Sequence, residues 1–128
     1  MKFDIITSTN LKPMPTKDEM SVAEVLANFF QSNIKFVARG VSHTPDIYVT
    51  RFRQYWEIKN IRGNGPRTIA NVLREAQHQS ENVAISLSRT NMNTQQAMGR
   101  IRKYLREGNT RVKRIIVIAK NKKVLVIK

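Results

Sequence analysis

Residues 44–59 read TPDIYVTRFRQYWEIK, and this stretch places two carboxylates, Asp46 and Glu57, inside apolar runs typical of β-strands. Side chains alternate between the faces of a strand. Glu57 and Lys59 are therefore expected to point the same way, roughly 7 Å apart, with Trp56 on the opposite face in the core. One short connection separates the two runs, so the strands are expected to pair. The stretch thus predicts two neighbouring carboxylates with an ammonium group on one face of a sheet.

This arrangement suggests a metal site. Two carboxylates at close range repel each other when ionised, unless a cation lies between them. Asp46 and Glu57 are therefore the candidate metal ligands, with Mg²⁺ favoured because it prefers oxygen, and with Mn²⁺ or Zn²⁺ as alternatives. Lys59 could hold an attacking water or stabilise charge on a phosphate in the transition state. A competing interpretation is that Asp46 caps a turn after Pro45 while Glu57 and Lys59 form an exposed ladder.

The sequence on both sides of this stretch predicts one α/β (α+β) domain. Thr16 and Glu19 form a T-x-x-E capping box before a helical apolar stripe, and Ser21 with Glu24 forms a competing one. Residues 1–15 are expected to be a lead-in and residues 16–128 the domain itself. A second helix is expected to begin at Pro66. The remaining expected elements are strands at 34–38, 46–50, 54–61, 82–87, 114–119 and 124–127, and a third helix at 94–106.

Charge is the strongest global property of the chain. It has 23 Lys and Arg against 9 Asp and Glu, a formal net charge of +14. Such an excess indicates a polyanionic partner, because neutralising phosphates releases counterions. The absence of cysteine rules out disulfides and thiolate metal sites. No apolar run reaches the ~18 residues of a membrane span, and the N-terminus does not read as a signal peptide.

The P-D…E-x-K pattern between two helices resembles the PD-(D/E)xK nuclease superfamily, whose core runs αβββαβ. More narrowly, the segments HTPDIYV, YWEIKN, NGP and TIANVLREAQHQSENVAI and the terminal strand pair resemble one group. These are the C-terminal nuclease domains of bacterial contact-dependent growth inhibition (CdiA-type) and polymorphic toxins, and the likeness covers residues 17–128. It implies the αβββαβ core with an added helix and a C-terminal strand pair around a mixed sheet.

The resemblance also implies a function. It implies a metal-dependent endonuclease that forms part of a larger toxin, is delivered from the cell surface and acts in the cytoplasm of a target cell. Several such domains cleave tRNA, which is therefore the favoured substrate, while DNA stays open because the same core more generally cuts DNA. It further implies a cognate immunity protein, which we expect to be acidic because a strongly positive surface attracts opposite charge.

The resemblance adds a third carboxylate on the first helix, where Glu19 and Glu24 compete. We choose Glu19, which projects toward the packed side, although its capping role is equally expected. Thr68 and Gln79 are expected to border the cleft from the second helix, Thr68 near phosphate and Gln79 positioning Lys59 or a backbone oxygen. Glu75 belongs to the same polar stripe and is expected to be ordinary solvated helix surface. Two arginines close to the site in sequence complete the candidate substrate-binding residues, Arg62 and Arg67.

Two alternatives to a nuclease stay open at this point. One is a basic module that binds nucleic acid without chemistry, and the other is a domain whose positive surface serves an acidic protein partner.

Overall fold

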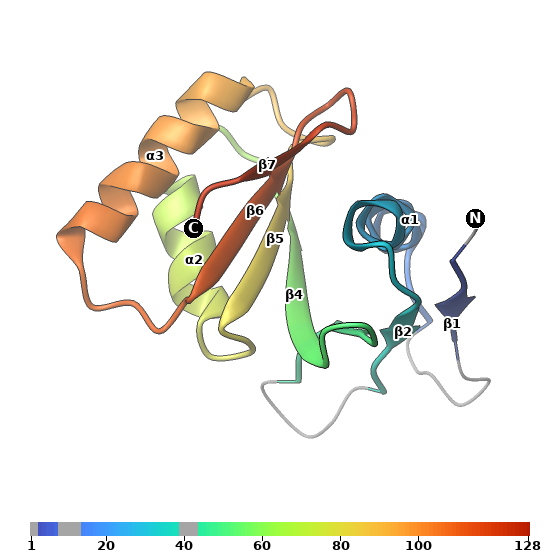
Figure 1. Cartoon of the computed structure of the whole chain (residues 1–128). Helices are drawn as coiled ribbons and strands as arrows, with labels where there is room; N and C mark the ends of the chain where they lie inside the picture. The colour runs from blue at the N-terminus through green and yellow to red at the C-terminus, as the bar shows by residue number, and fades with distance from the viewer. Residues whose placement is uncertain (1–2, 8–13, 39–43) are drawn as a thin grey trace.

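The computed structural model describes residues 3–7, 14–38 and 44–128, which form one mixed sheet with helices on both faces (Figure 1). The α/β architecture predicted from the sequence is confirmed. The first half of the chain contributes β1 (Ile5–Ile6), α1 (Lys17–Phe30), β2 (Ile34–Phe36), β3 (Ile47–Val49) and β4 (Gln54–Asn60). The second half contributes α2 (Thr68–Ala76), β5 (Asn82–Ser86), α3 (Thr94–Glu107), β6 (Arg114–Ile118) and β7 (Val124–Val126).

The seven strands lie in the sheet in the order of the sequence. β2, β3 and β4 pair antiparallel, β4, β5 and β6 pair parallel, and β7 returns antiparallel to β6. The two parallel connections run through α2 and α3, which cover one face of the sheet while α1 covers the other (Figure 1). In the described parts of the chain, no helix is long and apolar enough to cross a membrane.

Local signals account for the helix boundaries. Thr16 is the N-cap of α1 and Glu19 completes its capping box, so the alternative start at Ser21 is excluded. Asn93 and Gln96 form a second capping box at the start of α3. Gly108 ends α3 with a φ of 78°, a left-handed value that glycine adopts without strain.

The sheet separates two apolar layers. Trp56 and Ile58 of β4 face α1, where Trp56 is buried against Phe30. Val83 and Ile85 of β5 face α2 and α3. Every residue of β5 is buried, since helices and strands cover both of its faces. Trp56 is therefore a core residue on the face opposite Glu57, as the alternation predicted.

Several boundaries differ from those expected. The strands β2 and β3 are shorter, and α2 begins at Thr68 with Arg67 as its N-cap, so Pro66 lies in the turn before the helix. The N-terminal lead-in includes a strand, β1, which pairs parallel with β2 at the edge of the sheet. The second helix ends at Ala76, so Gln79 lies in the following turn and not on the helix. In the turn after α2, each backbone N–H bonds to the carbonyl three residues earlier: His78 N to Glu75 O at 3.2 Å and Gln79 N to Ala76 O at 2.9 Å.

Candidate active site

The pairing of β3 with β4 brings Asp46 beside Glu57. Ile47 pairs with Trp56, and the register continued by one residue places Asp46 opposite Glu57. The backbone N–H of Ile58 donates a hydrogen bond to Asp46 Oδ2 at 2.8 Å, and Asp46 N donates to the carbonyl of Trp56 at 3.2 Å. The Asp46 carboxylate is thus bound to the backbone of β4.

Glu57 is a buried carboxyl group. Glu57 is only 3% exposed, so it does not form the solvent-exposed ladder with Lys59 that the sequence left open. Burial raises the pKa of Glu57 to about 8, aided by the negative charge of Asp46 and a hydrogen bond between the two side chains, while Lys59 opposes the shift. Glu57 Oε1 is buried and has no hydrogen-bond partner among the described residues. The pair therefore retains a proton near neutral pH in place of a second negative charge.

Lys59 lies between two carboxylates. Its Nζ is 3.4 Å from Glu57 Oε2 and 3.1 Å from Glu75 Oε1. The side chain of Glu75 on α2 is 71% exposed, and we expected it to be ordinary solvated helix surface. That interpretation needs correction, because Glu75 also binds the ammonium group. The signal for this contact in the sequence is the spacing of seven residues between Thr68 and Glu75, which places both on the polar side of α2.

The oxygens of Asp46 and Glu57 fit a divalent cation. The raised pKa of Glu57 and its unpartnered Oε1 are the features that a positive charge between the carboxylates would relieve. No group of three or more histidines or carboxylates suited to a metal occurs in the part of the chain that the structure describes. Two carboxylates with water and phosphate as further ligands suit Mg²⁺ or Mn²⁺, whereas Zn²⁺ generally prefers nitrogen and sulfur.

Glu19 takes part in the cap of α1. Its Oε1 accepts a hydrogen bond from Thr16 N at 3.0 Å, and Thr16 Oγ1 accepts from Glu19 N at 3.1 Å. The competing structural role is thus present, and a catalytic role for Glu19 stays a prediction. The adjacent Asp18 receives three hydrogen bonds from Arg89 at 2.9–3.2 Å, and the pKa of Asp18 is lowered, chiefly by these bonds.

The four residues predicted to bind substrate lie at different places. Arg62 Nη2 is 3.8 Å from Asp18 Oδ2, near the start of α1. Arg67 is the N-cap of α2, without a side-chain capping bond, and Thr68 begins the helix. Gln79 Oε1 is buried without a hydrogen-bond partner among the described groups. It therefore does not accept a hydrogen bond from Lys59, which was one of the two roles expected for it.

A backbone oxygen beside the site is bound by residues that the sequence analysis did not select. Ser80 Oγ and Asn82 Nδ2 both donate to the carbonyl of Tyr55, at 3.0 and 2.8 Å. Ser80 directly follows Gln79, and its hydroxyl, not the Gln79 amide, binds this backbone oxygen.

The family model for the contact-dependent growth inhibition CdiA C-terminal domain matches residues 43–124. The chain belongs to this family. The fold is also similar to that of a CdiA-CT/CdiI toxin and immunity complex from Burkholderia pseudomallei. The two chains are 16% identical with a TM-score of 0.64, over 95% of this chain and 98% of the other. A comparison with curated protein sequences finds no match.

This CdiA C-terminal domain also carries a basic groove between α2 and α3. The groove has a volume of about 340 Å³. Arg100 is anchored at one end, where Nη1 donates to the carbonyls of Asn64 and Gly65 at 3.0 Å each. Of the predicted substrate-binding residues, Arg67 lines it. The other charged and polar lining residues are Asn71, Arg74, Arg100, Lys103, Tyr104 and Glu107.

Proposed function

We propose that this chain is a metal-dependent phosphodiester endonuclease of the PD-(D/E)xK type and the toxic part of a contact-dependent growth inhibition protein. The observation that carries the proposal is the pairing of buried Glu57 with half-buried Asp46, with Lys59 alongside. A buried carboxyl group whose pKa is raised beside a second carboxylate is costly for a fold, and this cost is explained if the two groups serve to bind a cation.

Each side chain has a role in hydrolysis. Asp46 and Glu57, once deprotonated, would hold the divalent cation, which when bound supplies positive charge beside the scissile phosphate. Lys59 donates a hydrogen bond to the attacking water or to a phosphate oxygen, and Glu75 keeps its Nζ in place. The water oxygen forms the new bond to phosphorus, the bond to the leaving oxygen breaks, and a proton ends on that leaving oxygen.

We favour tRNA as the substrate, with DNA as the alternative, on the strength of the family resemblance. The groove between α2 and α3 supports a nucleic acid of either kind, because four cations along one cleft suit a phosphate backbone. We further propose delivery from the cell surface as part of a larger protein and action in the cytoplasm of the target cell.

An immunity protein is the expected protein partner. The similar Burkholderia pseudomallei toxin occurs in a complex with one. A net charge of +14 favours an acidic partner, since opposite charges accelerate and orient association. Affinity for the cognate immunity protein that is the same at low and high salt would argue against this charge match.

Cleavage of total tRNA and of plasmid DNA, each with Mg²⁺ or with a chelator, tests the activity. We expect cleavage with Mg²⁺ alone, lost in Asp46→Asn and in Lys59→Ala. Both variants should keep the thermal unfolding transition of a folded domain and bind nucleic acid. Binding by the wild-type chain without any cleavage would instead identify a non-catalytic basic module.

A further inference from the structure

A pair of tyrosines lies on the same face of the sheet as the carboxylate pair. Tyr55 precedes Glu57 by two residues on β4, and Tyr48 is its partner on β3. Their ring centroids are 4.8 Å apart with an interplanar angle of 54°. The tyrosine pair is thus the next same-face pair along the two strands, roughly 7 Å from Asp46 and Glu57.

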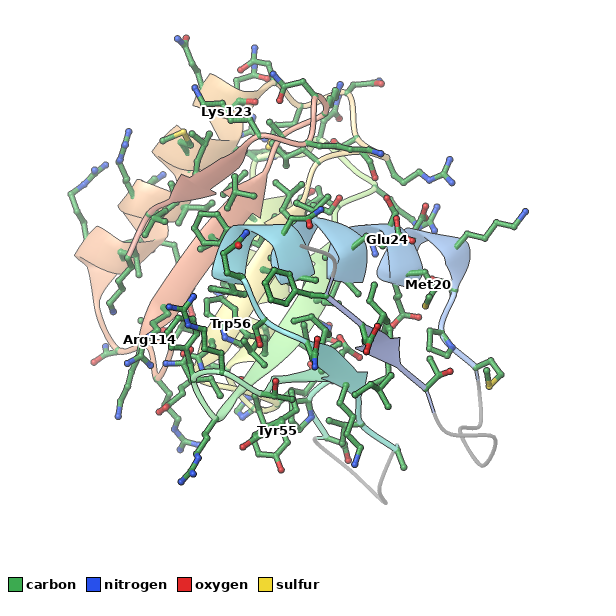
Figure 2. All side chains as sticks on the ribbon, turned by 45° about the vertical axis from the view of Figure 1, so that its right-hand side comes forward. Met20, Glu24, Tyr55, Trp56, Arg114 and Lys123 are labelled. Carbon is green, nitrogen blue, oxygen red and sulfur yellow. The ribbon has the colours of Figure 1, made fainter. Side chains whose placement is uncertain are left out.

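The ring of Tyr55 is available to a ligand. Tyr55 is 50% exposed, whereas its neighbour Trp56 is buried on the other face. Figure 2 shows Tyr55 at the outer edge of the molecule and Trp56 beneath α1. An exposed aromatic ring offers a flat apolar face that a planar partner can cover.

Tyr55 also lines a pocket next to Pro45, the residue that precedes Asp46. The pocket has a volume of about 570 Å³ and lies between the β3–β4 hairpin and the turn after α2, with Pro45, Arg53 and Gln79 among its lining residues. The bonds from Ser80 and Asn82 to the Tyr55 carbonyl fix the backbone under the ring. Gln79 Oε1 lacks a hydrogen-bond partner in the described part of the chain, so its amide gains one by turning toward a ligand.

The residues that line this pocket have the chemistry needed to bind a nucleobase. A half-exposed ring supplies a stacking surface, Arg53 supplies positive charge for a phosphate, and the Gln79 amide can bond the edge of a base. The roughly 7 Å that separates same-face neighbours such as Tyr55 and Glu57 on a strand is comparable to the distance between a phosphate and the base of its own nucleotide. A base paired in a duplex is stacked on its neighbours and cannot enter, so the ligand must be unpaired.

We propose that the Tyr55 pocket binds an unpaired nucleobase next to the scissile phosphate and thereby directs cleavage to single-stranded segments. This inference rests on the proposed nuclease function, because it places the base by reference to Asp46 and Glu57. It adds a specificity element that neither the charge nor the carboxylate pair provides.

Binding of a labelled single-stranded RNA and of the matching duplex, measured in an Asp46→Asn background that prevents cleavage, tests the proposal. Tyr55→Ala should weaken single-strand binding about tenfold or more, while Tyr55→Phe stays within about twofold of the parent. Duplex binding should not change. Phe52→Ala is the matched control, because Phe52 is 47% exposed on the same hairpin but packs against Phe30.

The outcomes separate this proposal from the nuclease proposal. Unchanged single-strand affinity in Tyr55→Ala, or an equal loss in Phe52→Ala, overturns the base pocket even if cleavage depends on Asp46. A selective loss in Tyr55→Ala supports the pocket even if the wild-type chain fails to cleave. Each variant is first checked for an unchanged thermal unfolding midpoint, since Tyr55 contacts Tyr48.

Discussion

Burial of Glu57 beside Asp46 gives the metal-free protein a specific dependence of stability on pH. The folded-state pKa is about 8 and the ordinary value is 4.5, so the folded chain binds a proton between these values that the unfolded chain has released. Protonated Glu57 thus contributes stability that is complete below about pH 4.5 and is lost as pH rises toward 8.

The free energy of unfolding in chelator should therefore fall by about 1.4 kcal/mol per pH unit from this group within that window. Denaturant titrations at several pH values measure this slope. Glu57→Gln removes the titrating group and should flatten the slope while keeping a hydrogen-bonding side chain. A stability that increases across the window, or the same slope in Glu57→Gln, would contradict the assignment.

At the scale of elements, the capping box of α1 offers a way to separate the two roles of Glu19. Glutamine also serves at the third position of a capping box, so Glu19→Gln keeps the cap and removes the carboxylate. If the catalytic prediction holds, Glu19→Gln loses cleavage while its unfolding free energy changes by less than about 0.5 kcal/mol.

Thr16→Ala is the control for the cap. It removes the bond to Glu19 N and should cost about 1 kcal/mol of stability with cleavage retained. Full activity in Glu19→Gln would leave that residue with its structural role only. Unfolding and cleavage measured on both variants decide between the two.

The elements were predictable where their signals are local. The capping box at Thr16 predicted the start of α1, and the glycine at 108 predicted the end of α3. The alternation around Trp56 predicted which face of β4 is in the core. The pairing of β1 with β2 could not be predicted, because a two-residue strand has no periodicity of its own. The contact of Glu75 with Lys59 depends on how α2 lies on β4, and no short stretch of sequence encodes that distance.

At the scale of the whole molecule, the net charge of +14 predicts binding to nucleic acid that weakens steeply with salt. If the α2–α3 groove follows the phosphates, Lys103→Ala and Arg74→Ala should each reduce the slope of log affinity against log salt by about one. Lys17→Ala, on the helix that covers the other face of the sheet, should leave the slope unchanged. Equal reductions from all three substitutions would indicate diffuse attraction without a groove.

The proposed metal site is tested most directly by titrating Mn²⁺ into the wild-type protein and Asp46→Asn at several pH values. Mn²⁺ accepts the oxygen ligands expected for Mg²⁺, and the amide oxygen of the substituted side chain could still accept the hydrogen bond from Ile58 N. We predict one Mn²⁺ per wild-type chain, bound more tightly as pH rises toward about 8 because Glu57 must release its proton, and a loss of this binding in Asp46→Asn. Equal affinity of the two proteins for Mn²⁺, or no binding by the wild type, would contradict a cation held by Asp46 and Glu57.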